Sequence, residues 1–218
     1  TQLLPAGQDA AFAKPLADRY RTVGGIVRGI AAAIAHGVAA ADAQCALAEG
    51  APLAQRLSVR YPIFQGPMTR VSDRAPFAQA VAEAGGVPFL ALALMRGAEV
   101  EALLTETAQR LAGRTWGVGI LGFVPAELRE EQLEVVRRIR PPVALIAGGR
   151  PAQAQPLEEL GIRTFLHTPS PGLLDLFLKQ GARRFVFEGM ECGGHVGPRS
   201  SLVLWEQQVA RLLAHPDP

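Results

Sequence analysis

The sequence has little of what several kinds of site require. Its two cysteines, Cys45 and Cys192, are too few for a disulfide framework or a multi-cysteine metal site, so a reducing cytosol is the expected compartment. Its charges sum to +2 and form no basic cluster, which argues against nucleic-acid binding. Its apolar runs fall short of the roughly 18 residues of a membrane span, and its first residues lack the layout of a signal peptide. These absences predict a cytoplasmic protein that binds neither membrane nor nucleic acid.

What the sequence does have is enough apolar material for a sizeable core, since 49% of its 218 residues are hydrophobic. From Tyr61 onward, a short apolar run, a loop rich in Gly or Pro and an amphipathic stretch alternate along the chain. The candidate strands are Pro62–Phe64, Val87–Leu94, Trp116–Leu121, Val143–Ala147, Arg163–His167 and Arg184–Glu188. The candidate helices are Arg74–Ala84, Ala98–Ala112, Pro125–Arg138, Ala152–Leu160, Pro171–Gln180 and Ser201–Ala214.

This alternation predicts an α/β fold with parallel strands and right-handed crossovers. The strand runs are continuously apolar, which indicates that both faces of the sheet are covered, as in a barrel or a doubly wound sheet. The beginning of the chain is different, because Val23–Leu47 is rich in alanine and has helical character. We therefore expect a helical N-terminal region over residues 1–57 and a β/α unit over residues 58–218.

Two segments combine an apolar strand with a glycine-containing end. Residues 61–68 read YPIFQGPM, and residues 187–197 read FEGMECGGHVG. Gly193 and Gly194 directly follow a strand and let the backbone approach a flat ring closely, which a Cβ atom would prevent. His195 lies in the same loop and can act as a base, a donor or a charge stabiliser near neutral pH.

These segments resemble the first-strand and sixth-strand motifs of the nitronate monooxygenase and FMN-dependent enoyl-acyl-carrier-protein reductase family. The likeness extends from residue 61 to about residue 206. It implies a TIM-type (β/α) barrel that holds FMN at the carboxyl ends of its strands, with NAD(P)H as the electron donor. It implies that His195 is the catalytic histidine. It also implies that the flavin is lined by Gln65, Gly66, Pro67, Met68, Glu188, Gly193 and Gly194.

The chain departs from the family pattern at three positions. Glu188 stands where Gln is common, Cys192 stands where Ala is common, and Gly119 is present where an Asn often follows the third strand. It also has six candidate strands, whereas such a barrel has eight. We therefore expect an incomplete barrel, about six of eight β/α units, that is a fragment of a longer protein and has exposed edges at its first and sixth strands.

The leading functional hypothesis is an FMN-dependent oxidoreductase domain that reduces an enoyl thioester or oxidises a nitronate-type carbon acid. Residues 66–73, 92–97 and 197–206 resemble the subgroup embedded in polyketide- or fatty-acid-synthase-like proteins, so other synthase domains and a small-molecule or carrier-bound acyl substrate are the expected partners. The exposed edges also favour pairing with a second copy of the chain. The alternative is a non-catalytic barrel fragment that serves as a docking element.

A few further positions have weaker patterns. Cys192 is interpreted as a packed residue, because no base can be paired with it from spacing. Gly148 and Gly149 suit either a phosphate-binding loop or a tight turn, and the sequence favours neither interpretation. Ser200 and Ser201 are expected to cap the last helix. No motif assigns a role to His36, His167 or His215, and no strand ends in a metal-ligand set, which disfavours a metal-dependent hydrolase.

Overall fold

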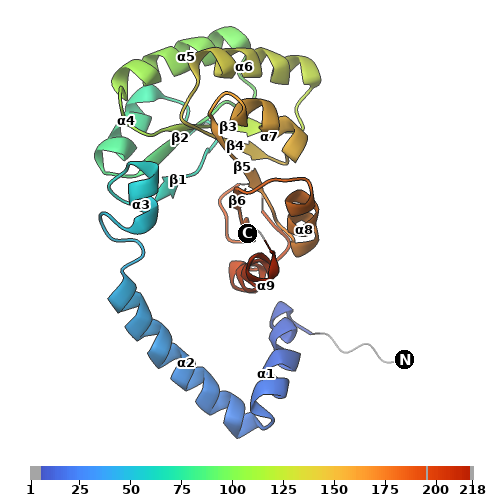
Figure 1. Ribbon diagram of the computed structural model, residues 1–218. Coiled ribbons are helices and arrows are strands. Elements are labelled where there is room, and N and C mark those ends of the chain that lie inside the picture. Colours follow the sequence, from blue (N-terminus) through green and yellow to red (C-terminus); the bar gives the residue numbers. More distant parts are fainter. Residues whose placement is uncertain (1–5, 195, 217–218) are drawn as a thin grey trace.

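The computed structural model describes residues 6–194 and 196–216, and it alternates strands with helices from β1 onward, as the sequence predicts (Figure 1). The strands are β1 (Phe64–Gln65), β2 (Val87–Ala91), β3 (Gly117–Leu121), β4 (Val143–Ala147), β5 (Arg163–His167) and β6 (Phe185–Val186). The helices between and after them are α4 (Ala75–Glu83), α5 (Gly97–Arg110), α6 (Ala126–Ile139), α7 (Pro151–Glu158), α8 (Pro171–Lys179) and α9 (Ser201–Ala214). The elements before them are the 3-10 helix η1 (Gln8–Phe12), α1 (Ala13–Tyr20), α2 (Val23–Gln44) and α3 (Pro52–Leu57).

Within the described residues the strands form one six-stranded sheet in the order β1-β2-β3-β4-β5-β6, and every neighbouring pair is parallel. The sheet is curled, because the ring of Phe64 in β1 contacts the ring of Phe165 in β5, with centroids 5.9 Å apart. The fold is therefore a half-barrel with six of the eight β/α units of a TIM-type barrel. This confirms the fold class expected from the sequence.

Both faces of the sheet contribute to a core. Strands β2 and β4 are buried along their whole length, in agreement with their continuously apolar sequences. In β4, Val143 and Leu145 join the inner cluster inside the curl, whereas Ala144 and Ile146 join the larger cluster under the helices. Because successive side chains of a strand point to opposite faces, one apolar strand supplies both clusters.

The short helix α3 packs at the amino ends of the strands. Its Ala54 and Leu57 are buried. The hydroxyl of Thr115 donates to the carbonyl of Leu57 at 2.7 Å, and Arg163 donates to the carbonyl of Arg56 at 3.2 Å. Helix α3 is thus attached to the strands that follow it, and the expected division of the chain near residue 57 stays a prediction.

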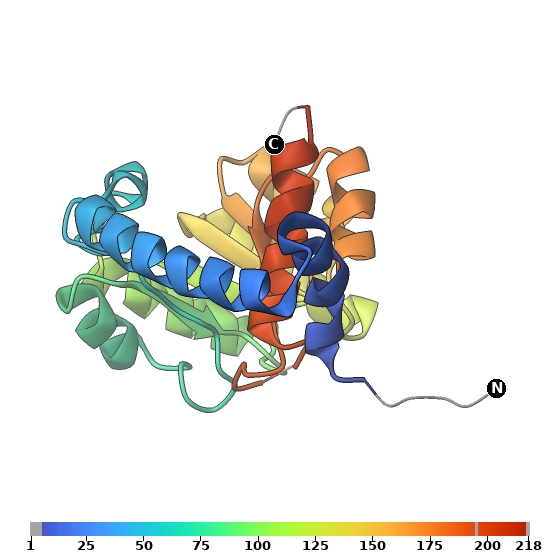
Figure 2. The same ribbon diagram turned by 90° about the horizontal axis from the view of Figure 1, so that it is seen from below.

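The elements η1, α1 and α2 form an arm that runs from α3, beside β1, to α9, beside β6 (Figures 1 and 2). The arm is fastened at its far end by Gln8. The Gln8 side chain donates to the carbonyl of Pro198 at 3.1 Å and accepts a hydrogen bond from the main-chain N–H of Ser200 at 2.7 Å. The arm therefore connects the two edges of the half-barrel.

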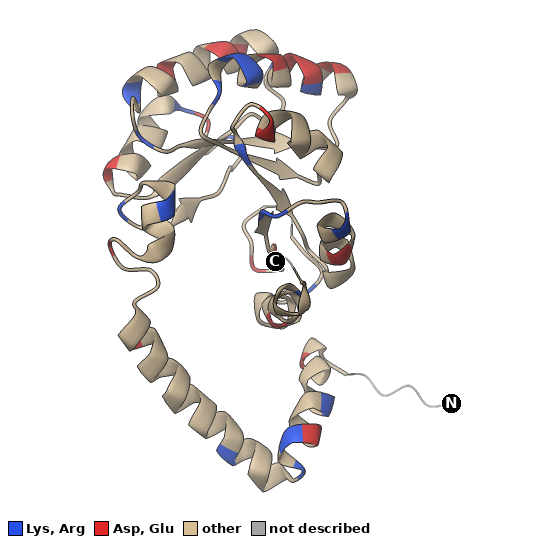
Figure 3. Cartoon of the chain, viewed as in Figure 1, with Lys and Arg blue, Asp and Glu red and all other residues tan. Residues whose placement is uncertain are grey.

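Helix α2 corrects one expectation from the sequence. It has 22 residues and a mean hydropathy of 1.5, so by length and composition it is able to cross a membrane, and no part of that stretch is buried. Inspection of apolar runs missed it, because its hydropathy comes from many Ala residues and scattered Val and Ile, with few charges along it (Figure 3). A single such helix assigns no membrane location, since core helices and signal sequences have the same character.

Candidate active site

The two predicted flavin-binding segments lie at the same end of the sheet, on its two edge strands. Gly66–Met68 follows β1, and Phe187–Gly194 follows β6. Because all strands are parallel, both segments are at the carboxyl edge, where barrels of this kind place their chemistry. The two segments flank the open side of the half-barrel (Figure 1).

The side chain of Gln65 is engaged within the sheet. Its Oε1 accepts a hydrogen bond from the N–H of Phe89 at 3.2 Å, and its Nε2 donates to the carbonyl of Phe89 at 3.4 Å. These bonds tie the end of the two-residue strand β1 to β2. In this structure Gln65 stabilises the position of the Gly66–Met68 segment.

The loop after β1 is held by Ser72, which is fully buried. The N–H of Met68 donates to the Ser72 hydroxyl at 2.7 Å, and the carbonyl of Met68 accepts from the N–H of Ser72 at 2.9 Å. The main-chain groups of Met68 are thus satisfied inside the loop. The side chain of Met68 remains available to a ligand, and the residue as a whole is 38% exposed. No motif marks Ser72, so sequence reasoning missed its role in holding the loop.

Pro67 packs directly against Gly119 in β3. A Cβ atom at Gly119 would lie 2.2 Å from the Cβ of Pro67, which is far inside van der Waals contact. The glycine that replaces the Asn of the resembling family therefore makes room for the proline of the first loop. This contact extends the β1 loop across β2 to β3.

Gly119→Ala is therefore expected to destabilise the fold. Pro67 is rigid and cannot turn away, so overpacking should lower the free energy of unfolding by about 1–3 kcal/mol. Denaturant unfolding measures the change, and Gly172→Ala in α8 is the matched control, because a Cβ atom at Gly172 meets no other atom within 4 Å. Equal stability of the two variants would contradict the packing of Pro67 on Gly119.

Three of the predicted flavin-binding residues are glycines with open space beside them. A Cβ atom at Gly66, Gly193 or Gly194 would meet no atom of the described residues beyond its chain neighbours within 4 Å. Their neighbours differ, because a Cβ atom at Gly197 would lie 2.2 Å from the carbonyl oxygen of Glu188. The packing of the chain thus requires glycine at Gly197 and leaves the backbone uncovered at Gly66, Gly193 and Gly194.

Glu188 lies just beyond β6, and its side chain is 13% exposed. Its Oε2 is 2.9 Å from Nδ1 of His167, the last residue of β5, although the ring is not oriented for a well-aligned hydrogen bond. Its Oε1 accepts a hydrogen bond from the Cys192 thiol at 3.5 Å. The structure thus brings to the carboxyl edge a histidine to which the sequence assigned no role, because the two partners are far apart in the chain.

Glu191 caps helix α9 in place of the expected serines. Its Oε2 accepts hydrogen bonds from the N–H and the hydroxyl of Ser201, at 2.8 and 2.7 Å, whereas the side chain of Ser200 makes no cap. The expectation that both hydroxyls cap the helix was wrong for Ser200, because a carboxylate from the preceding loop takes the free N–H. The Ser201 hydroxyl, followed by its main-chain N–H, holds the pKa of Glu191 below its ordinary value of 4.5.

Glu191→Gln is expected to change how stability depends on pH. A carboxyl whose folded pKa is depressed stabilises the fold fully above its unfolded pKa, and this contribution is lost as the pH falls through the folded pKa. The wild type should therefore lose more stability than the variant as the solution is acidified. Thermal unfolding across the acid range measures this, with Glu206→Gln on the same helix as the charge-matched control. Parallel pH curves for the wild type and Glu191→Gln would contradict the cap.

His195 lies outside the described residues, so its predicted catalytic role rests on the sequence. The base of its loop is described. The N–H of Gly197 donates to the carbonyl of Gly189 at 3.3 Å, and the N–H of Met190 donates to the carbonyl of Arg199 at 2.8 Å. These bonds close the loop beside Glu188. Among residues 6–194 and 196–216, no group of three or more His, Cys, Asp or Glu side chains is arranged to hold a metal ion.

Gly148 and Gly149, for which the sequence left two interpretations open, pack against neighbouring protein atoms. A Cβ atom at Gly148 would lie 2.8 Å from the ring of Phe123, and one at Gly149 would lie 2.3 Å from Ile146. The backbone of Gly149 also lies against Gly122 at the end of β3. Tight packing of the turn after β4 is therefore sufficient to explain both glycines.

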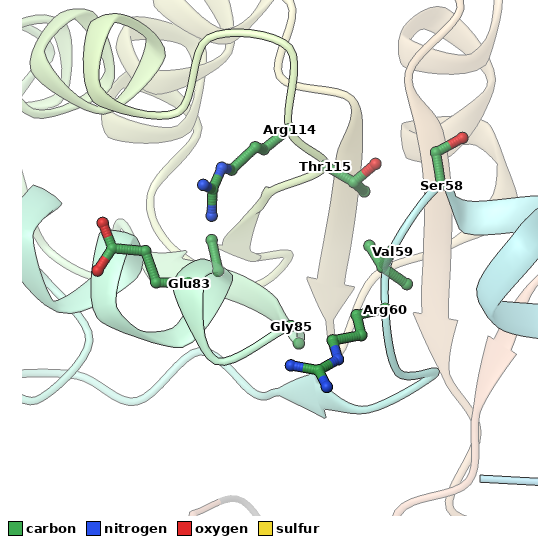
Figure 4. Close-up of a pocket in the computed structure, with 9 residues that line it drawn as sticks. Ser58, Val59, Arg60, Glu83, Gly85, Arg114 and Thr115 are labelled. Carbon is green, nitrogen blue, oxygen red and sulfur yellow. The ribbon is translucent and has the colours of Figure 1, made fainter. Parts of the chain in front are cut away.

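Two cavities are lined by described residues, and neither is lined by Glu188, Gly193 or Gly194. A cavity of about 260 Å³ is lined by residues that precede β1, β2 and β3, among them Arg60, Gly85 and Arg114 (Figure 4). It is therefore at the amino ends of the strands. A second cavity of about 270 Å³ lies along the exposed edge of β1, beside Phe64 and Gln65. The predicted flavin site stays a prediction, and its described glycines and the Glu188 pair all lie at the carboxyl ends of the strands.

Several solved structures resemble the chain. FabK from Thermotoga maritima is 25% identical, with a TM-score of 0.66, and the match covers 76% of this chain and 51% of that chain. A nitroalkane oxidase from Streptomyces ansochromogenes is 22% identical, with a TM-score of 0.65, and the match covers 76% of this chain and 59% of that one. The enoyl reductase domain of MlnA from Bacillus amyloliquefaciens is 15% identical, with a TM-score of 0.53 and coverage of 76% and 48%.

These matches show the fold, which the chain shares with structures named as a nitroalkane oxidase, an enoyl reductase domain and a putative lactate oxidase. The chain spans about half the length of the solved structures it matches. No protein-family model and no curated protein matches the sequence. The likeness thus agrees with the resemblance seen in the two glycine-containing segments.

Proposed function

We propose that this chain is the flavin-binding part of an FMN-dependent oxidoreductase. The observation that carries the proposal is the uncovered backbone at Gly66, Gly193 and Gly194, at the carboxyl ends of the two edge strands. A planar ring needs such a surface, since side chains at these positions would hold it away from the main chain. The resemblance to FabK, at 25% identity over 76% of the chain, supports the same interpretation.

The remaining predicted residues fit roles around that ring. Pro67, fixed against Gly119, and the exposed side chain of Met68 would border one edge, while Glu188 would present a polar group at the other. FMN, when bound, would supply hydride transfer between NAD(P)H and the substrate. His195 would donate or accept a proton at the reacting carbon of the substrate, as a general acid–base group does.

The substrate we propose is an enoyl thioester, which would be reduced with electrons from NAD(P)H, or a nitronate-type carbon acid, which would be oxidised with dioxygen as the electron acceptor. The names of the similar structures include both an enoyl reductase domain and a nitroalkane oxidase. We further propose that the thioester is carrier-bound and that the chain works beside other domains of a polyketide- or fatty-acid-synthase-like protein in the cytoplasm. This context is supported by sequence likeness in residues 66–73, 92–97 and 197–206.

A second candidate function is favoured by a specific observation. The chain has six strands, and both edge strands, β1 and β6, have a free side in the part of the chain that the structure describes. A barrel piece without catalysis would use such edges to dock other domains.

Titration of the purified chain with FMN, followed by flavin fluorescence, decides between the two candidates. The oxidoreductase proposal expects one FMN per chain, with the fluorescence quenched on binding, and expects NAD(P)H to bleach the bound flavin. A chain that is folded by circular dichroism and binds no FMN would favour the docking function and contradict the flavin proposal.

A further inference from the structure

The nearly buried carboxylate of Glu188 needs a partner, and the structure provides one from a different strand. A carboxylate with 13% of its side chain exposed loses most of its hydration. Nδ1 of His167 lies 2.9 Å from Oε2 of Glu188. An imidazole nitrogen that carries a hydrogen is a donor, and at this distance it is close enough to the carboxylate to offset its charge. The pair therefore links the end of β5 to the segment after β6.

The surroundings of the pair make it difficult to rearrange. The His167 side chain is itself 13% exposed, and the next residue, Thr168, is fully buried. The N–H of Thr168 donates to the carbonyl of Val186 at 2.9 Å, which fixes β5 against β6. On the other side, the Cys192 thiol donates to Oε1 of Glu188. Both oxygens of Glu188 are thus held, one by each neighbour.

We propose that His167 is a positioning residue of the flavin site and that its imidazole holds and compensates the Glu188 carboxylate at the edge of the bound ring. This inference rests on the proposed flavin function. An anion without a partner beside the ring would repel electron density as the flavin is reduced, whereas an imidazole 2.9 Å from the carboxylate offsets part of that repulsion. His167 thus allows Glu188 to stand at this position without weakening the binding of the cofactor.

A double-mutant cycle with His167→Gln and Glu188→Gln tests the pair. FMN affinity is measured by fluorescence titration for the wild type, both single variants and the double variant. His167→Gln should weaken FMN binding about tenfold, because it leaves the carboxylate uncompensated. Adding Glu188→Gln should then recover most of the lost affinity, since no anion remains. His36→Gln on α2, which is exposed, is the control for loss of a histidine.

If His167 had a merely structural role, the double variant would not recover FMN affinity, since two independent losses of packing would add. An FMN affinity of the double variant equal to or below that of His167→Gln would overturn the inference. The same cycle is run for denaturant unfolding of the flavin-free protein, which measures whether the pair is coupled without any cofactor. Coupling in unfolding without FMN binding by the wild type would contradict the flavin function and this role together. FMN binding with additive effects would overturn the role of His167 alone.

Discussion

Gly194→Val should leave the chain folded and almost abolish its affinity for FMN. A Cβ atom at Gly194 meets no described residue beyond its chain neighbours within 4 Å, and the φ of Gly194 lies outside the left-handed region, so a side chain there starts in open space on an unstrained backbone. A bound ring needs that same space. Forcing the two apart should cost up to about 3 kcal/mol, which corresponds to a loss of affinity of about a hundredfold.

The matched control for Gly194→Val is Gly37→Val. Gly37 is also free of contacts at its Cβ position, but it lies on α2, away from the strand ends. Both variants should unfold at nearly the same denaturant concentration as the wild type, and only Gly194→Val should lose FMN. If Gly194→Val bound FMN as tightly as Gly37→Val, the ring would not lie on this backbone.

His195→Ala should retain FMN and lose turnover by about a hundredfold or more, which is the range for a general acid–base group. The reason is chemical, since His195 is the imidazole of the glycine-rich segment that the resembling family uses for catalysis. Steady-state rates with enoyl-thioester and nitronate substrates measure the effect, and FMN titration checks that the site is intact.

His36→Ala is the matched control for that variant, because His36 is exposed on α2 and has no motif around it. It should turn over as fast as the wild type. Full turnover by His195→Ala with bound FMN would show that His195 takes no part in the chemistry. The remaining polar groups at the carboxyl edge, with His167 first among them, would then be the candidates for the acid–base role.

The regular part of the fold was predictable because a strand that is buried on both faces has a continuously apolar sequence. The runs Val143–Ala147 and Arg163–His167 were predicted with the bounds that β4 and β5 have. The end strands are shorter than predicted, since Phe64–Gln65 and Phe185–Val186 each pair on one side only within the described residues. An edge strand has fewer hydrogen bonds to define its limits.

The contacts of the site were less predictable, because they join residues that are distant in sequence. Nothing near Gly119 indicates that Pro67 packs on it, and nothing near His167 indicates Glu188. The cap by Glu191 was missed for a different reason. Ser200 and Ser201 have the residue type typical of caps, and the competing carboxylate reaches the helix from a loop that composition alone does not place.

The apolar character of helix α2 was not predicted, because the helix contains no long uninterrupted run of large apolar residues. Its small residues give a high mean hydropathy without forming the large apolar clusters that mark a core. Val38 is 66% exposed and Ile34 is 62% exposed, so the apolar side chains of this arm remain uncovered in the structure. Exposed apolar surface of this kind is typical of a place where further polypeptide packs.

The proposed flavin site needs the ends of β1 and β6 to bind one flat cofactor together. An NMR titration of the amide-labelled chain with FMN is the decisive experiment, because each glycine amide gives its own signal. The amides of Gly66, Gly193 and Gly194 should shift along one binding curve, while those of Gly37 and Gly161 stay fixed. Shifts confined to one of the two strand ends, or absent from both in a folded chain, would contradict it.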